Sequence, residues 1–522
     1  MLLQALTSHP GDASVLRGLV AASAALGDVD GTIGYFRQLA KRAARPLAVL
    51  DELGRYCLAH RRAGVAVDAY ERYLASHPES AVAHFNCAWY ATRAGRHEFA
   101  IGHYGRALAL GIDRPEEVHL NIANLCSGPL RDDARARQHL DKALAINPAY
   151  AAAWFNLGNL AEQQGDREEA RRCFGRCLEL EPGNVVALAR LADTHDFTGG
   201  TGPELFARLL EAAQRSLDPD LHFALGRAQE QRGEYAEAWR HFEIANAQDK
   251  RAFPVYEPAD WERRVDRIIA TCTPAWLAKL AQDQPRAPVF ICGMFRSGST
   301  LVEQVLAAHP AFTPAGEREF FPRLVASALP AYPDGLESVR ETQLRAWARA
   351  YGEESERIFG RSARLTDKRP DNFLYLGLIK ALFPRAKVVV TLRDWRDVAT
   401  SVFATRLGPA APYSTDLRHI RHFITQHDRL ISHWRSLFGD DVTTVRYEDL
   451  VAAPRATVER LLAALGEPWD ERCLAFHELR NTVQTASVWQ VRQPLYSGSV
   501  GRWQRFKEAF VVAFGPDVGA AS

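Results

Sequence analysis

A glycine-containing segment in the second half of the 522-residue chain has the spacing of a phosphate-binding loop. Residues 293–300 read GMFRSGST. In the G-x-x-x-x-G frame, backbone N–H groups and the start of the following helix hold an anion. An ATP- or GTP-binding loop of this kind continues with lysine and then serine or threonine. Here Ser299 occupies the lysine position and Arg296 supplies the cation earlier. The loop therefore predicts an anion site that differs from an ordinary ATPase or GTPase.

The residues around this loop predict a parallel α/β domain. An apolar run at 287–292 precedes the loop and an amphipathic segment at 301–308 follows it, as strand and helix. Two further apolar runs, 386–392 and 442–447, are each followed by a helical pattern. Alternating strands and helices predict a doubly wound parallel sheet, with its ligand beyond the carboxyl ends of the strands.

Arg393 follows the second of these strands, and Ser401 lies eight residues later in the next helix. At that spacing both side chains can approach one anion. A surface ion pair of Arg393 with Asp394 or Asp397 is the alternative. Because Asp394 lies among arginines, ion pairing is expected of it rather than Mg²⁺ binding. The sequence therefore favours a metal-free transfer reaction.

The first half of the chain repeats itself. Gly165, Gly199 and Gly233 fall at intervals of 34 residues, the tetratricopeptide period. The clearest unit spans 147–182, and the pattern predicts about six or seven helical hairpins stacked as a superhelix over roughly residues 1–247. The concave face of such an array usually binds a protein or peptide, while a spacer or dimerisation role stays open.

Composition places the chain in the ordinary globular class. Apolar residues make up 47% and charged residues 24%, with a net charge of +1. No overall field would attract nucleic acid, and no apolar run approaches the ~20 residues of a membrane span. The N-terminus shows no signal-peptide pattern. The eight cysteines are sparse, and the close pair Cys173 and Cys177 is expected to be packed thiols. These features predict a reduced, cytoplasmic protein.

Two of these segments resemble a known family. Residues 290–301 resemble the 5′-phosphosulfate loop of sulfotransferases that use 3′-phosphoadenosine-5′-phosphosulfate (PAPS), and residues 388–401 resemble their 3′-phosphate site. The similarity covers about 220 residues, from 288 to 503. It is strongest to tyrosylprotein sulfotransferases and to bacterial proteins that join tetratricopeptide repeats to a sulfotransferase domain.

The resemblance implies a nucleotide site. It assigns Arg393 and Ser401 to the 3′-phosphate and gives Tyr447 a nucleotide contact, with core packing as the alternative for that ring. Residues 487–494 and 501–503 resemble the family's closing segment over the nucleotide, which would place Ser487 on the phosphosulfate and Arg502 on the 3′-phosphate. The stretch 496–499 between them suits a mobile lid or an exposed loop. The loop residues assigned to the nucleotide are Arg296, Ser297, Gly298, Ser299 and Thr300.

The resemblance also implies catalytic residues. Segment 309–323 places Glu317 on the family's catalytic base, with Glu319 as its competitor and a surface charge cluster as the alternative reading. His309 is the other titratable group there, but a capped or packed histidine is commoner at such a helix end. Charge on the leaving group would be stabilised by three side chains: Arg296, Lys368 and Ser487, with Arg369 able to replace Lys368.

Together these observations predict a tetratricopeptide superhelix over 1–250, a helical linker over 251–287 and a P-loop-like sulfotransferase domain over 288–522. We expect transfer of a sulfuryl group from PAPS to a hydroxyl or amine, leaving the desulfated product PAP, without a metal. The acceptor would be a protein or peptide selected by the repeats, although a small molecule and a homodimer stay open. The alternatives are a repeat scaffold with a non-catalytic nucleotide domain and a metal-dependent P-loop kinase.

Overall fold

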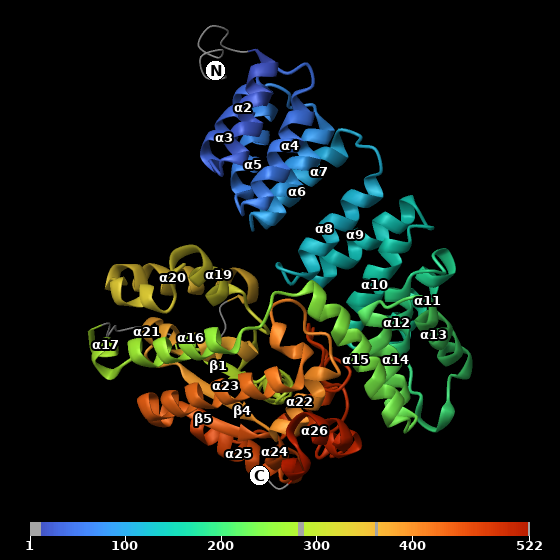
Figure 1. Ribbon diagram of the computed structural model, residues 1–522, viewed down its shortest axis with the longest axis vertical. Helices are drawn as coiled ribbons and strands as arrows, with labels where there is room; N and C mark the ends of the chain where they lie inside the picture. The colour runs from blue at the N-terminus through green and yellow to red at the C-terminus, as the bar shows by residue number, and fades with distance from the viewer. Residues whose placement is uncertain (1–11, 280–286, 361–363, 520–522) are drawn as a thin grey trace. The chain divides into compact units, whose positions relative to one another are not determined.

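The computed structural model describes residues 12–279, 287–360 and 364–519. The chain divides into two compact units, residues 1–160 and 161–522, and helix α10 (Ala151–Gln164) crosses the boundary. The second unit contains the last repeats together with the α/β domain (Figure 1). The boundary near residue 250 rests on the end of the sequence repeat, and as a domain limit it stays a prediction.

The first unit consists of helical hairpins. Its helices are α2 (Ala13–Ala25), α3 (Val29–Ala40), α4 (Pro46–Ala59), α5 (Ala63–Leu74), α6 (Ala81–Arg93), α7 (His97–Ala109), α8 (Pro115–Ser127) and α9 (Asp133–Ile146). Asp28 caps α3 by accepting from the N–H of Gly31. Gly27 and Gly95 adopt positive φ in turns between paired helices, so the chain reverses there.

The repeats continue into the second unit. Their helices are α11 (Arg167–Leu180), α12 (Val185–Asp193), α13 (Pro203–Arg215), α14 (Pro219–Gln231) and α15 (Tyr235–Ala252), followed by α16 (Pro258–Thr271) and α17 (Pro274–Lys279). Helices α14 and α15 approach closely at Gly226, where a Cβ atom would lie 2.5 Å from the Phe242 ring. This contact explains why the repeat requires a glycine at that position.

The α/β domain contains one sheet of five parallel strands in the order β2-β3-β1-β4-β5. Its strands are β1 (Val289–Gly293), β2 (Thr313–Pro314), β3 (Leu365–Lys368), β4 (Lys387–Leu392) and β5 (Val442–Arg446). The predicted parallel sheet is therefore confirmed. Strands β1, β4 and β5 are the three apolar runs expected from the sequence, whereas β3 is not expected, because it has only four residues and two of them are charged.

Helices surround this sheet (Figure 1). They are α18 (Ser299–Ala307), α19 (Phe320–Ala328), α20 (Glu341–Phe359), α21 (Leu376–Leu382), α22 (Trp395–Phe403), α23 (Leu417–Phe438), α24 (Tyr447–Ala452), α25 (Pro454–Leu465) and α26 (Lys507–Phe514). All five residues of β1 are buried. The continuous apolar run that predicted this strand therefore reflects burial on both faces.

The last repeat helix shares a hydrophobic core with the α/β domain. Trp239 of α15 stacks on Phe403 with ring centroids 4.7 Å apart and lies 5.1 Å from Phe506. Asn246 of the same helix donates its side-chain N–H to the backbone oxygen of Phe403 at 2.8 Å. The end of the repeat array is therefore fixed to the element that carries Ser401, because α22 ends at Phe403.

Candidate functional site

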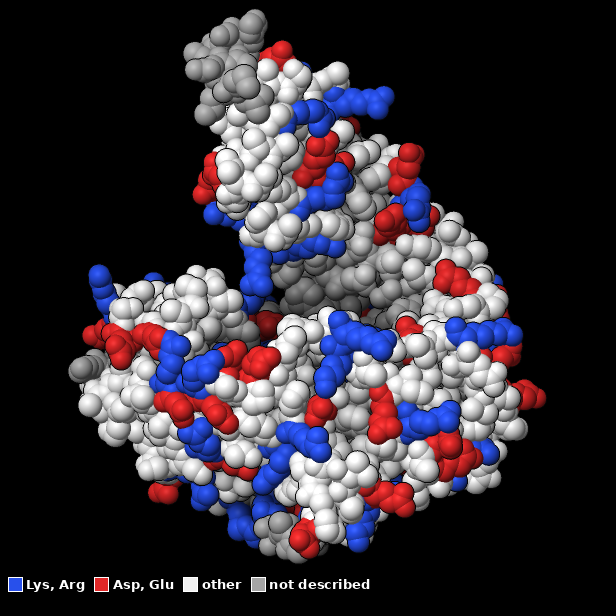
Figure 2. All heavy atoms as spheres, viewed as in Figure 1, with Lys and Arg blue, Asp and Glu red and all other residues white. Residues whose placement is uncertain are grey.

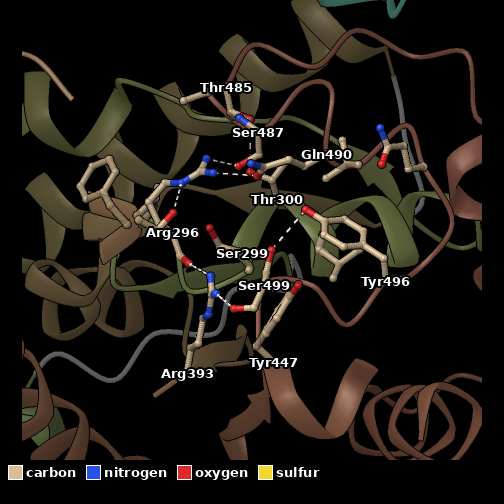
Figure 3. A pocket seen from close by; sticks show the side chains of 18 of the residues that line it. Arg296, Ser299, Thr300, Arg393, Tyr447, Thr485, Ser487, Gln490, Tyr496 and Ser499 are labelled. Atoms are coloured by element: carbon tan, nitrogen blue, oxygen red, sulfur yellow. Dashed lines mark hydrogen bonds between the residues drawn. The ribbon is translucent and has the colours of Figure 1, made fainter. Parts of the chain in front are cut away.

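A cavity of about 280 Å³ lies where the carboxyl ends of β1, β4 and β5 meet the closing segment 484–502 (Figure 3). Parallel strands bring their carboxyl ends to the same sheet edge, so residues distant in sequence converge there. The cavity is lined by most of the residues assigned from sequence: Arg296, Gly298, Ser299, Thr300, Glu317, Arg393, Ser401, Tyr447, Ser487 and Arg502. Ser297 and Lys368 are buried and do not line the cavity.

The glycines of the loop are required by close contacts. Gly293 has φ +147°, and a Cβ atom there would lie 2.5 Å from the backbone oxygen of Thr391. Gly298 has φ +102°, with the Tyr447 ring 3.0 Å from the Cβ position. Ser297 differs from its neighbours because its hydroxyl donates to Met294 O at 2.6 Å and lies 2.7 Å from Thr391 Oγ1. Ser297 therefore shapes the loop. Helix α18 begins at Ser299, and the N–H groups of its first turn have no partners within the helix.

Arg296 extends across the cavity. Its φ of 69° lies in the left-handed region that side chains rarely adopt. The guanidinium donates to Ser401 Oγ at 3.0 Å, to Gln490 Oε1 at 2.7 Å and to Ser487 Oγ (Figure 3). Burial, and then the nearby Arg502 and Arg393, lower the pKa of Arg296 to about 10. In the described part of the chain no carboxylate pairs with it, so a cation is held ready for an anionic ligand.

Arg393 lies below Arg296 in the same cavity. It donates to the backbone oxygen of Arg296 at 3.2 Å and to that of Ser499 (Figure 3). Its guanidinium carbon lies 4.6 Å from the centre of the Tyr447 ring. Burial lowers the pKa of Arg393 despite the opposing charge of Asp397, whose Oδ2 is 3.9 Å away. Within the described ranges its Nε is buried and has no hydrogen-bond partner.

Glu317 and Lys368 form an ion pair at the cavity. The Lys368 Nζ donates to Glu317 Oε1 at 2.6 Å, and Glu317 also lines the cavity. Arg369 points elsewhere, because it pairs with Glu319 at 2.6 Å and with Asp371 at 2.6 Å. Lys368 therefore pairs with Glu317, and Arg369 with Glu319. The geometry thus distinguishes the adjacent cations, and the two carboxylates, between which the sequence left the roles open.

Two other titratable residues of segment 309–323, Arg318 and His309, are engaged in other contacts. Arg318 donates to Glu354 at 3.0 Å and to Ser355 at 2.6 Å, so Lys368 is the paired cation of Glu317. His309 is buried; its Nδ1 accepts from Ala311 N at 3.2 Å and its Nε2 lies 3.1 Å from the backbone oxygen of Pro468. This histidine is packed and does not line the cavity.

Three further residues, Thr485, Gln490 and Ser499, line the cavity although no sequence motif singles them out. Thr485 accepts from Thr300 Oγ1 at 3.3 Å, and Gln490 accepts from Arg296. Ser499 joins the site through its backbone oxygen, which accepts from Arg393. The sequence indicates segment 487–494 only as a unit, and no local pattern distinguishes Gln490, whose partner Arg296 lies 194 positions away.

The arginines of the cavity, Arg296, Arg393 and Arg502, are concentrated at one place, whereas the surface charges are mixed. On the face shown in Figure 2, basic and acidic side chains are interspersed and neither sign dominates. Among the described residues, no group of three or more His, Cys, Asp and Glu side chains could hold a metal ion. In the same ranges, none of the helices has the length and apolarity to cross a bilayer.

The fold and the cavity define a class: tetratricopeptide repeats joined to an α/β domain with a phosphate-type loop. Residues 288–471 match the model of the sulfotransferase family, and residues 52–115 and 151–184 match tetratricopeptide repeat models. The chain therefore carries tetratricopeptide repeats and a sulfotransferase domain, and the predicted resemblance is confirmed.

Several relatives share these parts. An uncharacterised protein of Aquifex aeolicus (strain VF5) is 29% identical over 379 residues, covering 69% of this chain and 49% of that protein. Protein-tyrosine sulfotransferase 1 of Danio rerio is 29% identical over 202 residues, covering 37% and 56%. The sulfotransferase domain of the Synechococcus PCC 7002 olefin synthase is 23% identical with a TM-score of 0.33, covering 45% and 97%. The chain spans about half the length of the curated relatives it matches.

Proposed function

We propose that this protein transfers a sulfuryl group from PAPS to a hydroxyl or amine acceptor. The observation that carries the proposal is the convergence of Arg296, Arg393 and Ser401 in one cavity that also receives the paired carboxylate of Glu317. Arg296 is a buried cation with no carboxylate partner among the described residues, and such a group suits an anionic nucleotide. A carboxylate at the same cavity supplies a base for the acceptor.

The residues present fit a nucleotide with anionic groups at both its 3′ and 5′ positions. The buried Nε of Arg393 lacks a partner in the described residues and, with Ser401, would hold the 3′-phosphate. Tyr447 and Arg502 would complete that end of the site. The first-turn N–H groups of α18, with Ser299 and Thr300, would hold the 5′ end.

In this reaction the protein forms no covalent bond to the transferred group. The bond between sulfur and the bridging oxygen of the donor breaks as sulfur bonds to the acceptor oxygen or nitrogen, and PAP leaves with its bonding electrons. Glu317 takes the acceptor proton. Arg296 and Lys368, with the hydroxyl of Ser487, stabilise the negative charge that grows on the leaving oxygen.

We further propose that the repeats select a protein or peptide acceptor. Tetratricopeptide arrays commonly present extended binding surfaces, and several relatives are named protein-tyrosine sulfotransferases. In this proposal residues 1–250 recognise the acceptor, 251–287 connect the parts and 288–522 catalyse the transfer. Part of that linker, residues 280–286, lies outside the described residues.

The test is incubation with [³⁵S]PAPS and a cell extract in the presence of EDTA, followed by identification of the labelled product. A labelled peptide or protein, absent with Glu317→Ala, supports the whole proposal. A labelled small molecule supports the reaction and overturns the acceptor assignment. Binding of PAPS with no labelled product from any extract fraction overturns the reaction and favours the nucleotide-binding scaffold.

A further inference from the structure

The closing segment of the cavity rests on helices of the repeat array. Trp489 Nε1 donates to Glu162 Oε1 at 3.0 Å, and the N–H of Val483 donates to the backbone oxygen of Gln163 at 2.9 Å. Glu162 and Gln163 belong to the last turn of α10. The segment that carries Ser487 is therefore held from the repeat side as well as from the α/β domain.

A second contact involves Arg502, a residue proposed to bind the nucleotide. Glu230, near the end of α14, accepts from Arg502 Nε at 2.7 Å and from Arg502 Nη2 at 2.5 Å. Arg505 donates to the same carboxylate at 3.2 Å. Glu230 is only 9% exposed. Burial alone would raise the pKa of Glu230, but the guanidinium groups of Arg502 and Arg505 lower it below its ordinary value, so the carboxylate is ionised at neutral pH.

This contact uses one edge of the Arg502 guanidinium. A guanidinium has five N–H groups in a fixed plane, and a bidentate carboxylate occupies two of them. In the described part of the chain, Nη1 of Arg502 makes no hydrogen bond, while Arg502 lines the cavity. Glu230 thus fixes the orientation of the plane and leaves donors available to a ligand.

Without Glu230, the position of the Arg502 guanidinium at the cavity would be electrostatically unfavourable. Arg296 and Arg393 contribute like charges at the same cavity, and their repulsion would drive a free Arg502 side chain away. The Asp397 carboxylate fixes the neighbouring backbone, accepting from Gly501 N at 2.7 Å and from Trp503 N at 3.0 Å. Backbone and guanidinium are therefore held by separate carboxylates, and one of them comes from a repeat helix.

We propose that Glu230 is a positioning residue of the donor site, which presents Arg502 to the 3′-phosphate of the nucleotide. This inference rests on the proposed function of the cavity. Helix α14 does not line the cavity but supports it through Arg502, so the last repeats contribute to donor binding in addition to any role in acceptor choice.

The experiment compares PAP with AMP, which lacks the 3′-phosphate, by calorimetry on the full chain. Glu230→Gln should weaken PAP binding about tenfold and leave AMP binding unchanged, because only the contact to the 3′-phosphate is lost. Glu234→Gln is the matched control: Glu234 pairs with Arg232 at 2.8 Å and does not line the cavity, so it should keep the wild-type preference for PAP.

Two further variants separate positioning from folding. In an Arg502→Lys background, Glu230→Gln should cause no additional loss, since lysine cannot be held by a bidentate contact. Glu230→Asp keeps the charge but shortens the side chain, and it should also lose the preference for PAP. Circular dichroism establishes that each variant is folded.

An unchanged ratio of PAP to AMP affinity in both Glu230 variants overturns the inference, whether the two affinities stay the same or fall equally. In either case, tight binding of PAP by the wild type leaves the proposed function standing. A wild-type chain that binds neither PAP nor PAPS overturns both proposals together.

Discussion

Lys368 and Glu317 are joined by a 2.6 Å ion pair, yet the lysine side chain is fully buried whereas that of Glu317 is 31% exposed. An ammonium group is costly to bury without a partner. The carboxylate therefore stabilises the lysine from one side and faces the cavity from the other. This arrangement combines a structural function with a position suited to a base.

Replacing Glu317 should separate binding from chemistry. We expect Glu317→Gln to lower the rate of transfer by about 10²–10⁴-fold, the usual contribution of a general base. PAP affinity should change by no more than about threefold, a small energy on the scale of ~1.4 kcal/mol per tenfold, because Glu317 is not placed on the nucleotide phosphates. Single-turnover transfer to the identified acceptor measures the first effect and calorimetry measures the second.

Glu319→Gln is the control for that variant. Glu319 is 62% exposed and pairs with Arg369 rather than with Lys368. Its replacement should leave transfer near the wild-type rate. Turnover that survives in Glu317→Gln but falls in Glu319→Gln would exchange the two assignments.

Arg393 should determine the preference for a 3′-phosphate. Loss of a hydrogen bond to a charged group costs ~1.5–3 kcal/mol, so we expect Arg393→Ala to weaken PAP binding by about 10–100-fold and to affect AMP far less. Arg435→Ala, an exposed arginine of α23 outside the cavity, is the control. Equal losses for PAP and AMP would contradict the assignment of Arg393 to the 3′-phosphate.

The loop glycines predict a stability difference. Gly293→Ala brings a Cβ atom to 2.5 Å from a backbone oxygen at positive φ, and should lower the free energy of unfolding by about 3 kcal/mol or more. Gly175→Ala, in helix α11 with no atom within 4 Å of the new Cβ, should raise it by about 0.5–1 kcal/mol. Urea unfolding measures both. Equal stabilities would mean that the loop backbone can relax to accept a side chain.

A buried histidine pair in the repeats makes stability depend on pH. His222 and His241 face each other with Nδ1 atoms 2.7 Å apart. Burial, and then the neighbouring His222, lower the pKa of His241 from 6.5 to about 4, and burial lowers that of His222. Between these values the unfolded chain binds more protons, so stability is complete above about pH 7 and falls as the pH drops toward 4.

The measurement is the urea midpoint at about pH 7 and about pH 5, on either side of the ordinary histidine pKa of ~6.5. The double variant His222→Gln/His241→Gln should show a smaller loss between the two than the wild type. His77→Gln, at an exposed site, should behave as the wild type. An unchanged slope in the double variant would show that the pair does not control acid sensitivity.

The sequence predicts much of the fold because its signals are periodic or continuous. The 34-residue glycine spacing reflects repeated helix turns, and the apolar runs of β1, β4 and β5 reflect burial on both faces. Strand β3 was not predicted because Asp367 and Lys368 are charged although buried. Their partners, Tyr351 and Glu317, lie outside the strand. Short strands with paired charges leave no apolar signal.

The candidate site was predictable where motif and strand end coincide, as at Arg296 and Arg393. The partners of those residues were not predictable. Nothing near Glu230 in the sequence indicates that it meets Arg502, 272 positions away, and the burial of Ser297 within the loop depends on Thr391 of the neighbouring strand. Such contacts are set by tertiary packing.

The most direct test of the central claim is calorimetric titration of the wild-type chain with PAP in EDTA, compared with Mg-ATP in magnesium buffer. We predict binding of PAP without a metal, at least tenfold tighter than Mg-ATP, because the cavity presents cations for both ends of a 3′,5′-substituted nucleotide. Preferential binding of Mg-ATP would contradict the account and indicate a metal-dependent phosphoryl-transfer enzyme instead.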